Sequence, residues 1–143
     1  MAKPSECREV ADNFLADRFI WFDFPGLDPG VLDSLHAVLT GCAAKKPYTP
    51  EADILPLLYE KDPQLGCWVF RIPDDWIKEI ANINPSQASA LTKRLIKNNW
   101  RLKQLDNMGG VDVACIEERL LGLTHLCNQA VEGKSSLLLF VSL

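Results

Sequence analysis

The chain has 143 residues, of which 48% are apolar and 24% charged, and its formal net charge is -4. This balance is typical of a globular protein and excludes a disordered chain, a collagen-like repeat and a coiled-coil rod. The length is close to the commonest size of one domain, so we expect a single domain over residues 1–143. No apolar run approaches the ~20 residues that a membrane helix needs, so no membrane association is expected.

The N-terminal residues and the cysteines bear on the cellular compartment. Residues 1–9 contain no apolar stretch of the kind found in a secretory signal. The five cysteines are odd in number and widely spaced, unlike the cysteines of a disulfide framework. We therefore expect a cytoplasmic protein with free thiols.

Helix signals dominate the first forty residues. A helix is predicted over 5–17, and the aromatic stretch 19–26 that follows is expected to form a buried extended segment or turn. The next helix is the best marked in the chain. Asp28 suits its capping position, Pro29 suits its first helical position, and Gly41 provides a C-terminal stop.

The middle of the chain contains the best strand candidate. A helix is predicted to start at Glu51 and to carry the apolar residues of 54–59, although Pro56 kinks it or confines it to a short piece. Residues 61–66 predict a turn. Residues 67–72 are rich in β-branched and aromatic side chains and indicate a strand, with an extended loop as the alternative.

Three further helices and an apolar tail complete the chain. A short helix is expected to open at 73–75, a longer one to run from Asn84 toward Leu105, and a final one to cover 113–131. The five apolar residues 137–141 must be covered, and we expect them to pack against the final helix and the strand candidate. Together these elements predict a mostly α fold, a compact bundle of six or seven helices with at most two or three short strands.

Two phrases of the sequence, residues 24–41 and 68–75, combine helix signals with aromatic residues. With the Gly133-Lys134 pair ahead of the apolar tail, they resemble a group of small uncharacterised bacterial proteins. The resemblance covers roughly half of the chain. It implies a bacterial, cytoplasmic origin and carries no activity or ligand with it.

No constellation in the sequence is typical of a catalytic or metal site. Neither GxGxxG nor GxxxxGK[ST] occurs. The pairs His36/Cys42 and His125/Cys127 lack the spacing of zinc ligands. We therefore predict that the protein is not an enzyme and uses no cofactor or metal. The alternative is an enzyme or small-ligand-binding protein with a pocket hidden from the sequence, where a histidine would meet a cysteine or carboxylate.

Charge is distributed unevenly along the chain. Residues 1–80 carry 14 acids and eight bases, whereas residues 106–143 carry five acids and two bases. Between them, residues 81–105 carry five bases and no acid. This middle block is the strongest signal of a contact surface in the sequence.

The basic block predicts a stripe on one helix. Lys93, Lys97 and Arg101 are spaced by four residues and lie close to Trp100 in the sequence, with Arg94 and Lys103 alongside. The stripe is a solvated face that pairs with acids elsewhere in the fold, a contact surface for an acidic protein or a second copy, or a nucleic-acid site. The net negative charge and the lack of a nucleic-acid-binding motif argue against the last of these.

The tryptophans and the charges together suggest a function. Trp21 and Trp76 are expected in the core, and Trp68 and Trp100 at the surface, where tryptophan is a frequent interface residue. We predict a small cytoplasmic protein-binding domain that acts through its surface, in particular an immunity or antitoxin protein that neutralises a toxin by covering it. The predicted contacts are Trp68, Asp74 and Asp75 toward a basic partner, and Lys93, Lys97, Trp100 and Arg101 toward an acidic one.

Overall fold

The computed structural model describes residues 27–43, 50–60 and 67–142. The helix expected over 5–17, the aromatic stretch 19–26 with Trp21, and the turn expected at 61–66 lie outside the described residues. The single-domain prediction stays a prediction, as does the count of six or seven helices, which includes the 5–17 helix.

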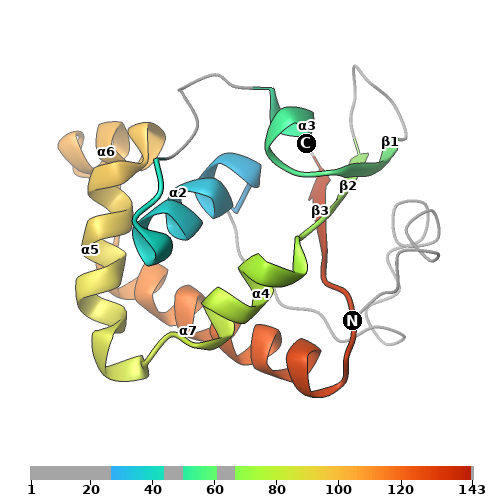
Figure 1. Ribbon diagram of the computed structural model, residues 1–143. Coiled ribbons are helices and arrows are strands. Elements are labelled where there is room, and N and C mark those ends of the chain that lie inside the picture. Colours follow the sequence, from blue (N-terminus) through green and yellow to red (C-terminus); the bar gives the residue numbers. More distant parts are fainter. Residues whose placement is uncertain (1–26, 44–49, 61–66, 143) are drawn as a thin grey trace.

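The fold is mostly helical, as predicted, with a small three-stranded antiparallel sheet (Figure 1). The described residues form five helices of eight residues or more, one helix of four residues and one 3-10 turn. No helix among them is long and apolar enough to cross a membrane. In chain order the elements are α2 (Pro29–Thr40), α3 (Glu51–Ile54), β1 (Leu57–Glu60), β2 (Cys67–Arg71), α4 (Asp74–Ala81), η2 (Pro85–Gln87), α5 (Ala88–Asn98), α6 (Trp100–Asn107), α7 (Val113–Glu132) and β3 (Leu138–Ser142).

Local signals place α2 and α7 where the sequence predicts them. The Asp28 carboxylate accepts a hydrogen bond from the Val31 N–H at 2.8 Å and so caps α2. Gly41 ends that helix with φ 75°, a left-handed conformation that favours glycine. Asp112 caps α7 by accepting from the Cys115 N–H at 3.3 Å, and that helix ends at Gly133 as predicted.

The sheet joins the strand candidate to the C-terminal tail. Strand β2 lies in the middle of the order β1-β2-β3, and Phe70 is paired with Leu139 of β3. The strand prediction for 67–72 is confirmed, and the tail is extended as expected. Leu137 and Leu139 are buried and belong to the main core, which also includes Cys127 and Ala130 of α7.

The helix predicted to start at Glu51 is confined to a short piece, which is one of the two effects expected of Pro56. Helix α3 ends at Ile54, and the extension of this helix over residues 57–59 is wrong, because residues 57–60 form β1. Pro56 is the cause, because the residue before a proline prefers an extended backbone, and Leu55 has φ -125° and ψ 145°. The Pro56 carbonyl then accepts from the Arg71 N–H at 2.9 Å, which brings this segment alongside β2.

The core lies between the helices and one face of the sheet (Figure 1). Leu32 of α2, Ile80 of α4 and Leu120 of α7 are all 0% exposed. Cys127 is buried among them, and burial raises the pKa of its thiol to about 12, as suits the small core residue that the sequence predicts. Trp76, expected in the core, instead lies half-buried at its edge.

The apolar tail is expected to be essential to the fold. Each buried leucine in it contributes about 1.5–3 kcal/mol by removal from water, and β3 also pairs along the whole of β2. Deletion of residues 137–143 should therefore give an insoluble or unfolded protein, measured by circular dichroism and sedimentation of the lysate. A deletion variant that kept the wild-type melting temperature and solubility would show that the tail is not part of the core.

Candidate functional site

The basic block is interrupted at Asn99. The sequence predicts one helix through Trp100 toward Leu105, and the structure shows that this is wrong: α5 ends at Asn98 and α6 begins at Trp100. Asn99 between them has an extended backbone, with φ -99° and ψ 120°. Its N–H donates to the Leu95 carbonyl at 2.9 Å, while its side-chain Oδ1 accepts from the Leu102 N–H at 3.0 Å. One residue thus ends α5 and caps α6.

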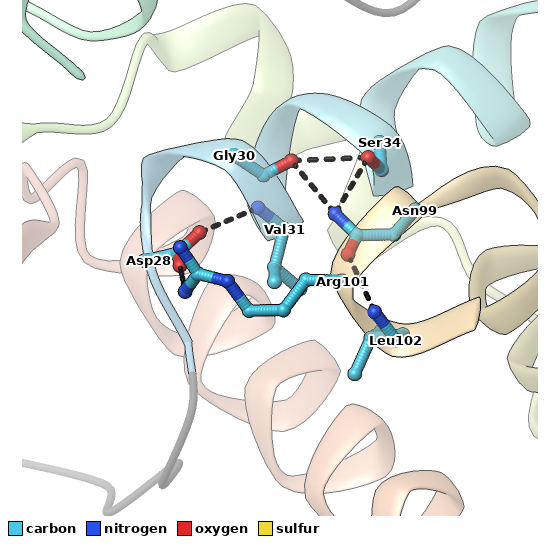
Figure 2. A network of polar contacts seen from close by, with 7 residues as sticks. All are labelled: Asp28, Gly30, Val31, Ser34, Asn99, Arg101 and Leu102. Atoms are coloured by element: carbon cyan, nitrogen blue, oxygen red, sulfur yellow. Dashed lines mark hydrogen bonds and ion pairs between the residues drawn. The ribbon is translucent and has the colours of Figure 1, made fainter. Parts of the chain in front are cut away.

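The Asn99 side chain also binds α2. Its Nδ2 donates to Ser34 Oγ at 3.0 Å and to the Gly30 carbonyl at 3.5 Å, and Ser34 Oγ itself donates to Gly30 at 3.0 Å (Figure 2). Asn99 is 4% exposed and Ser34 5%. Since buried polar groups are costly unless they are hydrogen-bonded, this set of contacts fixes the corner between α5 and α6 against the first turns of α2.

Two arginines of the basic block fasten the same helices to α2. Arg101 forms an ion pair with Asp28, whose other carboxylate oxygen caps α2 (Figure 2). Arg94 donates from Nη2 to the Val38 carbonyl at 3.2 Å, near the other end of α2. The guanidinium of Arg101 also lies 5.7 Å from the ring centroid of Trp100. Both arginines are therefore engaged within the fold.

The predicted stripe on one helix is therefore wrong, and the lysines differ from the arginines. Lys93 and Lys97 lie one turn apart on α5, whereas Arg101 belongs to α6. In the part of the chain that the structure describes, Lys93, Lys97 and Lys103 are exposed and none has an ion pair. These three residues are named the lysine surface below. One interpretation of the stripe is that its bases pair with acids elsewhere in the fold. Among the five described bases of the block, this holds for Arg101 alone.

Exposed apolar groups follow the lysine surface in the chain. Leu105 on α6 is 42% exposed, and Met108, in the turn after α6, is 82% exposed. Gly109 has φ 72° in the same turn. Trp100 is half-buried rather than fully at the surface. The surface of α6 and of the turn after it thus combines positive charge with apolar side chains, a mixture that protein interfaces use.

The other predicted contacts lie elsewhere. Trp68 is half-buried on β2, and its indole donates to a carboxylate oxygen of Glu60 on β1 at 2.7 Å. Asp74 lies 3.7 Å from a guanidinium nitrogen of Arg71, and Asp75 is exposed beside it in the first turn of α4. The structure does not bring this group together with the basic one, since β2 and the start of α4 are remote from α5 and α6 (Figure 1).

Both histidines lie in the described part of the chain. The His36 ring stacks on Trp76, with 4.5 Å between centroids and 13° between planes. Among the described residues, neither His36 nor His125 is hydrogen-bonded through its ring to a cysteine or a carboxylate. The same residues include no group of three or more histidine, cysteine, aspartate and glutamate side chains placed to hold a metal ion.

Comparison of the chain with protein-family models, with curated proteins and with solved structures gives no match.

The carboxyl group of Glu51, which interacts with Asp28 and Arg101, has a shifted pKa. Burial raises the pKa of Glu51 above its usual value of 4.5, the neighbouring Asp28 carboxylate raises it further, and Arg101 lowers it. The folded state thus favours the protonated form of Glu51 more than the unfolded chain does.

This shift predicts a pH-dependent effect of Glu51→Gln. Because the folded pKa is raised, Glu51 binds more protons in the folded state, so its contribution to stability falls as pH rises from 4.5 through the raised value. The free energy of unfolding of Glu51→Gln relative to wild type should therefore increase between pH 4 and pH 7, measured by urea titration at both values. A difference between the two proteins that stays constant or declines over this range would contradict the assigned environment.

Proposed function

We propose that the protein is a protein-binding domain whose contact surface is the lysine surface. Two observations support this. The three ammonium groups are exposed and have no ion pair among the described residues, and the helices that carry them, α5 and α6, are held to α2 by Asn99, Arg94 and Arg101. A charged surface on a fixed scaffold recognises a complementary partner without ordering of the backbone, so only side-chain entropy is lost at the contact. The partner is therefore a protein with an acidic surface.

A protein partner suits this surface better than a nucleic acid does. The whole chain carries a net charge of -4, which repels a phosphate backbone at long range. The exposed Leu105 and Met108 offer apolar contact, which a protein pocket accepts and a phosphate backbone does not. Nucleic-acid binding is therefore the alternative outcome of the experiment below.

The specific form of this proposal is an immunity or antitoxin protein of the bacterial cytoplasm. The toxin would present an acidic face to the lysine surface, in place of the basic face that the sequence predicts for contact with Trp68, Asp74 and Asp75. The alternative protein partner is a second copy of the chain, whose acidic residues would contact the lysine surface. The seven contact residues predicted from the sequence have different roles under this proposal. Lys93 and Lys97 contact the partner, Arg101 and Trp100 support them, and Trp68, Asp74 and Asp75 belong to a separate part of the surface.

Charge reversal on α5 tests the proposal. The tagged chain would be co-expressed with the products of its two neighbouring genes and purified at about 50 mM salt, where charge-driven contacts are weakly screened. Wild type should retain one of the products, or itself form a dimer by sedimentation. Lys93→Glu/Lys97→Glu should lose that partner, because two attractive contacts become repulsive, with a Kd increase of about tenfold or more.

Lys78→Glu/Lys134→Glu is the matched control, since it changes the net charge equally at two exposed residues outside α5 and α6. It should retain the partner. The proposal fails if wild type retains neither product and is monomeric, or if both variants lose the partner equally. It is replaced by the nucleic-acid alternative if a labelled DNA duplex binds at about 50 mM salt, is released near 200 mM, and requires Lys93 and Lys97.

A further inference from the structure

A hollow of about 250 Å³ lies between α4 and the end of α7. Ile77, which is 3% exposed, and Ala130, which is 1% exposed, form part of its lining together with the exposed Val131. The helices α4 and α7 pack against each other (Figure 1), and Ile77 and Ala130 of the lining belong to the core of the fold. The lining thus provides an apolar floor on a rigid support.

Polar groups surround this floor. Lys78 of α4 and Lys134, two residues after the end of α7, are among the residues that line the hollow. Ser135 and Ser136, both half-buried, also line it, and the Ser135 hydroxyl donates to the Gly133 carbonyl at 3.4 Å. Asp74 also lines the hollow, but its charge is offset by Arg71 at 3.7 Å. The hollow therefore carries a net positive charge.

Lys134 has an unfavourable backbone conformation. Its φ of 50° is left-handed, and it is the only residue other than glycine with a positive φ among the described residues. The Ser135 N–H donates to the Ala130 carbonyl at 2.9 Å and the Lys134 N–H to the Val131 carbonyl at 3.3 Å, the pattern of a Schellman motif. That motif usually has glycine at this position, because a side chain is disfavoured in the left-handed region.

The glycine at the end of α7, Gly133, precedes the left-handed position by one residue. Gly133 has φ -83°, which any residue adopts, whereas Lys134 occupies the position where glycine would be favourable. Lys134 thus has a backbone conformation that disfavours a side chain, and it lines the hollow. Strained positions of this kind are concentrated at functional sites.

We propose that the hollow between α4 and the end of α7 binds a small organic anion with an apolar part. The ammonium groups of Lys78 and Lys134 bind the anionic end, and Ile77, Ala130 and Val131 contact the apolar end. The inference is independent of the lysine surface, because it concerns different residues and a different class of ligand.

Titration with millimolar benzoate, followed by amide chemical shifts of the full chain, tests the proposal, with benzylamine as the probe of opposite charge. Benzoate should shift the amides of residues 74–78 and 130–136, and benzylamine should not. Lys134→Gly should weaken benzoate binding about fivefold, since one charged contact is lost. The same substitution should raise the melting temperature by about 2–4 °C, because glycine adopts the left-handed conformation without strain.

Lys134→Arg is the matched control, because it keeps the charge and should bind benzoate as wild type does. The opposite changes in stability and in binding separate a ligand-binding role from a structural one. The proposal is overturned if benzoate shifts no amide in these two segments, if benzylamine shifts them equally, or if Lys134→Gly binds benzoate as tightly as wild type.

Discussion

The hydrogen bonds of the Asn99 side chain decide how three helices of this protein are arranged. A carboxamide carries both an acceptor and two donors, and Asn99 uses the acceptor to cap α6 and the donors to bind Ser34 and Gly30 of α2. Because the group is buried, each of these bonds has to be made or its desolvation remains uncompensated. The corner between α5 and α6 therefore has one favourable position relative to α2.

The arginines and the lysines of the basic block have different roles at this corner. Arg101 reaches Asp28 and Arg94 reaches the Val38 carbonyl because α5 and α6 meet at this angle beside α2. Planar guanidinium groups suit such fixed contacts, whereas lysine ammonium groups are strongly hydrated and remain in solvent. Within the basic block, the positive charge without an ion pair among the described residues is thus carried by Lys93, Lys97 and Lys103.

Signals that act within one turn were readable from the sequence. Asp28, Pro29 and Gly41 define α2, and Asp112 and Gly133 define α7, because caps and stops depend on neighbouring residues. The break at Asn99 was missed because the apolar spacing continues into α6, and its stabilising partner Ser34 lies 65 residues away. Strand β1 was missed for the same reason, since it depends on pairing with β2. Composition revealed the basic block but not which of its members the fold engages.

A double-mutant cycle on Asn99 and Ser34 tests most directly whether this buried contact holds the helices together. The free energy of unfolding would be measured by urea titration for wild type, Asn99→Ala, Ser34→Ala and the double variant. Asn99→Ala should cost about 2–3 kcal/mol, since it removes a helix cap and buried hydrogen bonds, and the coupling energy should be about 1 kcal/mol. Strictly additive effects, with a cost below about 0.5 kcal/mol for Asn99→Ala, would contradict the account.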